Sequence, residues 1–380
     1  MVVGQPTPPP EAHDRDATRR RRATNPQAGD PSNRDAARGR VTQDLTVIVP
    51  AYNEAESIAD TVKSLLNQSA PPARIIVVDD CSTDDTAAIA EALGVEVLRP
   101  PVNTGSKAGA QTFALHHVET GYTMAIDADT VLDPDALELL AGAFDVHGVA
   151  AASGFVLPRY VRSVWERGRY VEYLYSFTFH KVVQDYYGKP LISSGCLSIY
   201  RTDVLCEVGG WSNRTMAEDM DLTWTLYEHG WKVRFFPDAV SYPIEPDSLH
   251  FLAKQLKRWS HGFVQNVALH WRALLGLRYL RSMIAISFFD AIVAPIMTLF
   301  VLPVLAVLVS PWFLVAYVID VPVVAVPVLV GAHRRGEFRQ GVTSLPAYFA
   351  LRLANCWFML CAVTSELVFR KRLAVYEKGH

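Results

Sequence analysis

The chain has 380 residues, 50% of them hydrophobic, and its mean hydropathy of +0.13 is high for a soluble enzyme. The formal net charge of −3 shows no basic excess, so we expect no nucleic-acid partner. The five cysteines show no Cys-x-x-Cys spacing, which disfavours a disulfide framework and a zinc site.

The first 43 residues differ in composition from the rest of the chain. Residues 1–43 are rich in Pro, Arg, Asp and Ala, with eight arginines against five acidic residues and almost no aliphatic run. Such a segment has too few apolar side chains to form a core. We therefore expect a disordered, mildly basic N-terminal tail.

Short apolar runs then alternate with helical patterns. The runs, typical of buried strands, cover residues 45–50, 74–79, 95–98 and 123–127, and the helical patterns between them cover residues 55–68, 82–93 and 105–118. This alternation predicts an α/β domain with a parallel sheet and right-handed crossovers. Ligands of such sheets bind beyond the carboxyl ends of the strands. Three polar clusters fall there, at residues 50–54, 79–85 and 127–129.

Four carboxylates follow the last of these strands. Asp133, which precedes a proline, is typical of a helix N-cap, and Asp135 would lie in the first turn of that helix. Asp127 and Asp129 come before the cap with one small residue between them, so both can reach one point. A divalent cation such as Mg²⁺ or Mn²⁺ accepts one or two carboxylates and leaves its other positions to substrate phosphates. The pair alone is a weak signal, since Asp-x-Asp also occurs by chance.

The C-terminal part of the chain is strongly apolar. Residues 281–370 contain three segments long enough to cross a bilayer as helices, at 283–309, 311–331 and 345–369. The loop between the second and third, residues 332–340, is basic. By the positive-inside rule this loop faces the cytoplasm. The preceding α/β domain should then face the cytoplasm too, below a multi-pass region of the inner (plasma) membrane.

The third apolar segment is less certain than the other two. It contains Arg352, Asn355 and Glu366, which are costly in lipid. Either this segment packs against its neighbours or it lies at the membrane interface. Residues 257–281, before the first span, have the pattern of an amphipathic interfacial helix.

Five motifs occur in a fixed order along the α/β domain. They are PAYNE (50–54) with VVDDCSTD (77–84), NTGSKAGA (103–110), DAD (127–129), AEDMDL (217–222) and QLKRW (255–259). With this ordered set the chain resembles the membrane-bound, often processive family 2 glycosyltransferases, which include cellulose, hyaluronan, chitooligosaccharide and poly-N-acetylglucosamine synthases. The resemblance covers about residues 44–275 and the spans that follow. It implies a GT-A (Rossmann-like) α/β catalytic domain followed by an α-helical transmembrane region.

The resemblance also implies the residues that bind a UDP-sugar donor. The implied donor site consists of Ala51, Tyr52, Glu54, Asp79, Asp80, Lys107, Asp127 and Arg258. Asp127 and Asp129 would hold Mg²⁺ or Mn²⁺ under the diphosphate. Arg258 would pair with the diphosphate, because a planar guanidinium suits phosphate oxygens. Interfacial anchoring is the alternative for Arg258 and its neighbour Trp259.

One base is enough for transfer from a UDP-sugar. A metal and a cation can neutralise the leaving diphosphate, so no carboxylic acid has to protonate it. By resemblance Asp219 takes the proton of the acceptor hydroxyl, and direct displacement inverts the anomeric centre. Glu218 and Asp221 are the alternatives, and all three acids could instead cap a helix. The implied acceptor site consists of Ser194, Gly195, Glu218 and Trp259.

The expected function is therefore inverting transfer from a UDP-sugar to the growing end of a β-linked saccharide. N-acetylglucosamine is the favoured sugar and glucose the second. The alternative is transfer of one sugar to a polyprenyl phosphate or other lipid acceptor. A non-enzymatic membrane scaffold ranks last, because all the acids are intact. Three spans form a thin wall for a channel, so a homo-oligomer or a translocation partner is possible.

Overall fold

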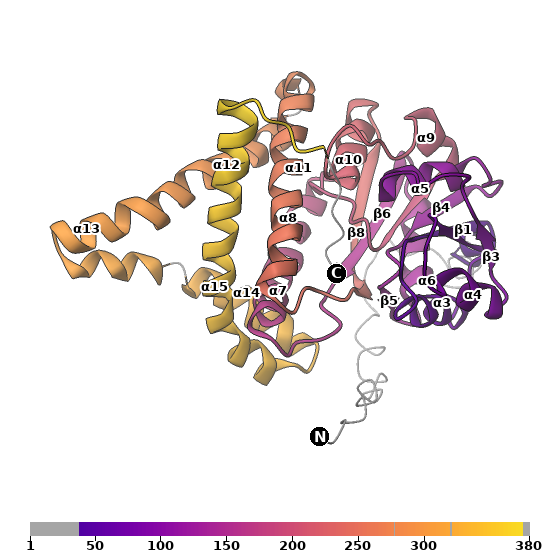
Figure 1. Ribbon diagram of the computed structural model, residues 1–380, viewed down its shortest axis with the longest axis horizontal. Helices are drawn as coiled ribbons and strands as arrows, with labels where there is room; N and C mark the ends of the chain where they lie inside the picture. Colours follow the sequence, from indigo (N-terminus) through magenta and orange to yellow (C-terminus); the bar gives the residue numbers. More distant parts are fainter. Residues whose placement is uncertain (1–37, 277, 320, 375–380) are drawn as a thin grey trace.

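The computed structural model describes residues 38–276, 278–319 and 321–374 (Figure 1). Residues 38–42 are already helical, and Val41 and Thr42 are buried. Residues 38–42 therefore do not belong to the disordered tail expected for residues 1–43. The remainder of that tail, residues 1–37, lies outside the described residues.

The α/β domain is built on one mixed sheet of eight strands, in the order β3-β2-β1-β4-β7-β6-β8-β5. The strands are β1 (Leu45–Ala51), β2 (Arg74–Asp79), β3 (Glu96–Leu98), β4 (Tyr122–Ala125), β5 (Val131–Leu132), β6 (Val149–Val156), β7 (Ser198–Arg201) and β8 (Lys232–Tyr242). The first four are parallel, as predicted. The other half is mixed, because β7 runs antiparallel to both β4 and β6, and β5 antiparallel to β8.

Helices cover both faces of the sheet, because alternate strand residues point to opposite sides. In β1, Val47 and Val49 join one core cluster with α3 (Ile58–Leu66), α4 (Thr86–Ala92) and α6 (Ala136–Ala141). Ile48 joins a second cluster on the other face. That cluster includes side chains of α5 (Lys107–Leu115), α9 (Thr202–Glu207) and α10 (Glu218–Glu228).

The helix predicted to follow Asp133 begins later than expected. Its first residue is Ala136, and Asp135 rather than Asp133 occupies the N-cap, without a side-chain capping hydrogen bond. Asp133 instead accepts a long hydrogen bond of 3.5 Å from the hydroxyl of Tyr242 on β8. The N-cap prediction was therefore wrong, although neither carboxylate belongs to the polar rim of the sheet.

Four further segments connect this domain to the apolar C-terminal part. They are α7 (Val164–Tyr175), the π-helical turn η2 (Ser176–His180), α8 (Lys181–Tyr186) and the long α11 (Leu249–Gly276). Ser163 and Glu166 form a capping box that fixes the start of α7. The interfacial helix predicted around residues 257–281 corresponds to most of α11 and to the first residues of α12 (Arg278–Ile296).

The described residues contain three helical stretches long and apolar enough to cross a membrane: Arg281–Leu308, Pro311–Arg334 and Phe338–Val368. The first comprises most of α12 (Arg278–Ile296), η3 (Met297–Val301) and α13 (Leu302–Leu308), and the second comprises η4 (Pro311–Tyr317) and α14 (Val321–Arg334). In Figure 1 α13 projects away from the rest of the molecule, whereas α12 packs against α15 along part of its length. Side chains near the turn, such as Val307 and Trp312, are 84% and 80% exposed.

The third stretch, α15 (Phe338–Val363) with η5 (Thr364–Val368), packs along α7 and α11 (Figure 1). Near its middle, Asn355 donates a hydrogen bond of 2.7 Å to Glu172 of α7. Near its end, Glu366 accepts hydrogen bonds of 2.7 Å from His261 and Gln265 of α11. These polar side chains of the segment are therefore paired with α7 and α11.

Both ends of α15 also reach the α/β side of the molecule. Just before the helix, Glu337 accepts a hydrogen bond of 2.7 Å from the hydroxyl of Tyr170 on α7. Just after η5, the carbonyl of Leu373 accepts one of 2.9 Å from Gln265. The two ends of this stretch thus contact α7 and α11, which both lie on the α/β side of the molecule.

Candidate active site

The loops after β1 and β2 are joined into one unit. Ala51 and Asp79, the last residues of the two strands, are paired in register. Beyond them, the N–H of Asn53 donates to the Ser82 hydroxyl at 2.9 Å, and the N–H of Glu54 donates to the Thr86 hydroxyl at 2.8 Å. These bonds hold Glu54 in place and leave the neighbouring Tyr52 side chain 43% exposed. Both residues predicted for the donor site therefore lie at the rim of the sheet.

Asp80 organises the next loop. Its carboxylate accepts hydrogen bonds from the N–H of Thr104 at 2.7 Å and from the Thr104 hydroxyl at 2.8 Å. Ser106 then caps α5 by accepting from the N–H of Gly109 at 3.0 Å. Asp80 thus fixes the loop that begins α5, whose first residue is Lys107. The adjacent Asp79 accepts from the N–H of Ser82 at 3.2 Å.

Lys107 is the point where four segments meet. Its ammonium forms an ion pair with Asp127 beyond β4, lies 3.8 Å from Glu218 of α10 and donates to the Gly195 carbonyl at 3.2 Å. Burial opposes the charge, but the carboxylates of Asp127 and Glu218 outweigh it and raise the pKa of Lys107. Lys107 is therefore a fixed positive charge among predicted donor and acceptor residues.

Asp219 lies in the first turn of α10, beside this cation. One carboxylate oxygen accepts a hydrogen bond of 3.1 Å from the N–H of Gly195, and the other accepts one of 2.8 Å from the N–H of Met220. Burial raises the pKa of the preceding Glu218, and the charge of Asp219 adds to this effect. Lys107 opposes it. The two carboxyl groups therefore differ in environment although they are adjacent in sequence.

Asp221, the other alternative base, is occupied elsewhere. It is buried, and Arg214 donates to its two oxygens at 2.7 and 2.8 Å. The imidazole of His270 on α11 lies 2.7 Å from it and 2.5 Å from Glu228. Asp221 thus joins α10 to α11, and this network was not expected from the sequence.

Asp127 and Asp129 fit a divalent cation by their chemistry. Both carboxylates are partly exposed just beyond β4, and the Thr130 hydroxyl donates to Asp129 at 3.1 Å. Within the described residues no group of three or more His, Cys, Asp or Glu side chains could hold a metal. Two carboxylates of this kind match the preference of Mg²⁺ or Mn²⁺ for hard oxygen donors.

The QLKRW motif lies within α11. The positive charge of Arg258 acts on Glu218 and opposes the rise of its pKa. Trp259 carries the guanidinium of the buried Arg169 over its ring, at 4.5 Å from the centroid. Gln255, the first residue of the motif, accepts a hydrogen bond of 2.6 Å from Arg169. Gln255 and Trp259 of the motif thus join α11 to α7 through Arg169. One face of the Trp259 ring, which was predicted to contact the acceptor, is covered by this guanidinium.

Lys181 is a charged residue near the site that the sequence did not single out. It is 6% exposed, and its ammonium has no hydrogen-bond partner among the described residues. The ammonium lies 4.5 Å from the ring centroid of Phe177 and 5.4 Å from that of Phe235. Burial lowers the pKa of Lys181 to about 8, although the nearby carboxylate of Asp219 acts in the opposite direction. No spacing in the helical pattern of residues 181–186 signals this environment.

Comparison with known proteins shows similarity to glycosyltransferases. The model of glycosyl transferase family 2 matches residues 46–209. An uncharacterized glycosyltransferase of Escherichia coli, YaiP, is 32% identical over 249 residues, which are 60% of this chain and 59% of that protein. The poly-β-1,6-N-acetyl-D-glucosamine synthase of Staphylococcus epidermidis is 28% identical over 223 residues, 57% and 54% of the two chains. The chain thus spans little more than half the length of these relatives.

A solved structure shows the same fold. The mannosyltransferase of Pyrobaculum calidifontis, in complex with GDP-mannose and Mn²⁺, superimposes with a TM-score of 0.56 at 18% identity. The match covers 85% of this chain and 87% of that one. The α/β domain therefore has the predicted GT-A fold, followed by apolar helices long enough to span a membrane.

Proposed function

We propose that this protein, whose residues 46–209 form a family 2 glycosyltransferase domain, transfers a sugar from a UDP-sugar to a saccharide acceptor with inversion. The observation that carries the proposal is the convergence of Lys107, Asp127 and Asp219 beyond the carboxyl ends of the strands. The uridine would lie at the rim formed by Ala51, Tyr52, Glu54, Asp79 and Asp80.

The donor diphosphate would lie between two sources of positive charge. A divalent cation on Asp127 and Asp129 would neutralise part of the charge that develops on the leaving UDP. Lys107 supplies a fixed ammonium at the same place, and Arg258 approaches from α11. Because this charge is already stabilised, departure of UDP needs no proton from a carboxylic acid.

Asp219 is the proposed base. The N–H groups of Gly195 and Met220 hold its carboxylate in place by hydrogen bonds of 3.1 and 2.8 Å. As the acceptor oxygen bonds to the anomeric carbon, its proton passes to Asp219 and the bond to UDP breaks on the opposite face. The product is a β-linkage when the donor is α-linked. Glu218 lies beside Asp219 on the proposed acceptor side.

The acceptor would approach Asp219 past Ser194, Gly195 and Trp259. We place Lys181 there as well, because its buried ammonium has no hydrogen-bond partner in the described part of the chain. An unpaired buried charge is costly, so an oxygen of the acceptor is a suitable partner. This feature also supports the second candidate, a lipid phosphate acceptor, since a phosphate suits an ammonium still better. N-acetylglucosamine is the favoured sugar, with glucose second.

The apolar helices would attach the enzyme to the inner membrane, with the α/β domain in the cytoplasm. The turn of the hairpin formed by Arg281–Leu308 and Pro311–Arg334 projects from the body and exposes apolar side chains (Figure 1). The basic run after α14 would lie on the cytoplasmic side. We place α15 in the plane of the interface, beside α11, because both of its ends contact the same body.

The test is sugar transfer by the detergent-purified protein. Labelled UDP-sugars would be offered with Mg²⁺ or Mn²⁺, and products sized on a gel, with Asp219→Asn as the control variant. We expect a metal-dependent saccharide from one donor and a loss of about 10²–10⁴-fold in the variant. Single addition to a lipid extract would instead support the lipid acceptor, and equal activity of the variant would exclude Asp219 as the base.

A further inference from the structure

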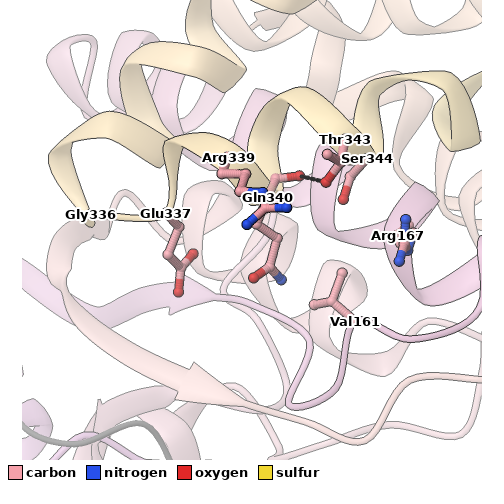
Figure 2. A pocket seen from close by; sticks show the side chains of 8 residues that line it. All are labelled: Val161, Arg167, Gly336, Glu337, Arg339, Gln340, Thr343 and Ser344. Carbon is pink, nitrogen blue, oxygen red and sulfur yellow. Dashed lines mark hydrogen bonds between the residues drawn. The ribbon is translucent and has the colours of Figure 1, made fainter.

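A pocket of about 410 Å³ lies away from the candidate active site, between α7 and the start of α15 (Figure 2). Its polar wall contains Arg167 from α7, and Arg339, Gln340, Thr343 and Ser344 from α15. None of these residues belongs to the donor, acceptor or metal site. The pocket is therefore a separate feature of the molecule.

Two guanidinium groups in this wall are unpaired. Within the described part of the chain, neither Arg167 nor Arg339 has a hydrogen bond or ion pair from its side chain. Other arginines nearby are engaged: Arg335 donates to the Pro237 carbonyl at 3.1 Å, and Arg159 pairs with Asp60 at 2.6 Å. Guanidinium groups are well suited to bind phosphate oxygens.

The remaining wall also offers hydrogen-bond donors. Ser344 is 1% exposed, and its hydroxyl lacks a hydrogen-bond partner in the described residues although it lines the pocket. The 26-residue helix α15 begins at Phe338, six residues before Ser344, and the N-cap residue Glu337, which also lines the pocket, makes no side-chain capping hydrogen bond. The first N–H groups of a helix have no partner within the helix and favour an anion. The buried hydroxyl and the uncapped helix start thus both offer hydrogen-bond donors to an anion in this pocket.

One negative group opposes this arrangement. Glu337 also lines the pocket, but its carboxylate accepts the hydrogen bond of 2.7 Å from Tyr170. Figure 2 shows its side chain directed away from that of Arg167. Two arginines against one engaged carboxylate leave the pocket with an excess of positive charge.

We propose that this pocket binds the phosphate of an anionic lipid headgroup. The pocket opens at the turn between α14 and α15, where the chain leaves the apolar hairpin. Exposed apolar side chains of α14, such as Val323 and Val326, lie just before the basic run at the turn. Basic pockets in this position of a membrane protein recognise anionic headgroups. The site would anchor α15 at the bilayer surface, and it does not depend on the proposed sugar transfer.

The probe is a short-chain phosphatidylglycerol, titrated into the detergent-purified full chain, with phosphatidylcholine of equal chain length as reference. Binding is followed by the rise in unfolding temperature and by native mass spectrometry. We expect saturable binding of phosphatidylglycerol and no saturable binding of phosphatidylcholine. The double variant Arg167→Gln/Arg339→Gln should weaken it about tenfold or more, since both charge-assisted hydrogen bonds are lost. Arg334→Gln, in the same basic run but outside the pocket, should bind normally.

Three outcomes would overturn the proposal. They are no difference between the two lipids, equal affinity in the double variant and wild type, and inorganic phosphate binding as tightly as the lipid. The last would assign the pocket to a free anion. Ser344→Ala serves as a second, milder variant, because it removes one hydroxyl without changing the surface charge, and it should weaken binding while retaining the wild-type unfolding temperature.

Discussion

The backbone N–H of Gly195 donates a hydrogen bond of 3.1 Å to the carboxylate of Asp219, while the carbonyl of the same glycine accepts one of 3.2 Å from Lys107. One peptide segment thus fixes both the proposed base and the cation of the donor site. Gly195 is suited to this position because a side chain would intrude. A Cβ built there would lie 2.9 Å from the Lys107 nitrogen and 3.5 Å from an oxygen of Asp219.

We expect Gly195→Ala to lower transfer strongly without unfolding the protein. The added methyl group meets the flexible end of Lys107 rather than backbone, so the fold can adjust by moving the ammonium away from the site. A displacement of about 1 Å can cost about 10²-fold in rate. The measurement is transfer rate together with unfolding temperature. Gly39→Ala is the matched control, because nothing lies within 4 Å of its Cβ position. Equal activity of the two variants would contradict the role of Gly195.

Asp129→Ala should lose metal-dependent donor binding. A divalent cation held by two carboxylates loses one of its two protein ligands in this variant. Isothermal titration with UDP, with and without Mn²⁺, measures the effect, and we expect the metal-dependent part of the affinity to disappear. Asp135→Ala is a suitable control, since Asp135 lies at a helix N-cap without a side-chain hydrogen bond. Unchanged metal-dependent binding in Asp129→Ala would remove this residue from the proposed metal site.

Lys181→Met should raise the KM for the acceptor and leave the KM for the UDP-sugar near the wild-type value. Loss of a hydrogen bond from a charged group to the acceptor corresponds to about tenfold or more in KM. Lys189→Met is the matched control, because Lys189 is also a partly buried lysine placed over an aromatic ring, 4.1 Å from the centroid of Tyr227. If acceptor KM is unchanged in Lys181→Met, this lysine merely packs on Phe177 and Phe235.

The same lysine gives a pH test. Its ammonium faces the rings of Phe177 and Phe235, the thiol of Cys196 and the carboxylate of Asp219, and burial lowers its pKa to about 8. The charged form therefore disappears as pH rises through about 8. We expect acceptor affinity to fall over this range in the wild type and to persist in Lys181→Arg, which stays charged. Parallel pH profiles of the two proteins would count against the assignment.

His270 should stabilise the protein most at lower pH. Burial disfavours its charge, but Asp221 and Glu228 outweigh burial and raise its pKa. A histidine with a raised folded pKa contributes stability fully below its unfolded pKa of about 6.5 and loses it as pH rises through the folded value. His270→Gln should therefore lower the free energy of unfolding by about 1–3 kcal/mol at pH about 6, and by less at higher pH. The unfolding temperature should fall accordingly. His250→Gln, on the exposed start of α11, is the control. A difference that does not depend on pH would mean that His270 is neutral.

The first half of the sheet was predictable because its strands are apolar, short and separated by helical patterns. β6 was missed, since its sequence VAAASGFV is built of small residues with weak strand preference. All eight of its residues are nevertheless buried, and Gly154 is required because a Cβ there would approach Leu197 within 2.2 Å. Tertiary packing, which no local pattern shows, decides this strand.

The acids of the site were predictable from ordered motifs, whereas their supports were not. Asp221 and His270 are 49 residues apart, and their contact depends on how α11 packs on α10. Lys181 is buried only because η2 and α8 pack against β8. The polar residues of the third apolar segment gave a useful warning, since Asn355 and Glu366 pair with α7 and α11 instead of facing lipid.

The last prediction concerns which side of the membrane the C-terminal end occupies. Leu373 lies against Gln265 of α11, so residues after α15 should face the same side as the α/β domain. We would introduce a single cysteine at Lys371, in a chain without the native cysteines, and compare it with a chain that retains only Cys206. Both positions are exposed. A membrane-impermeant maleimide applied to sealed vesicles should label both from the same side. Labelling from opposite sides would show that α15 crosses the bilayer, because a crossing helix must carry its far end away from the domain.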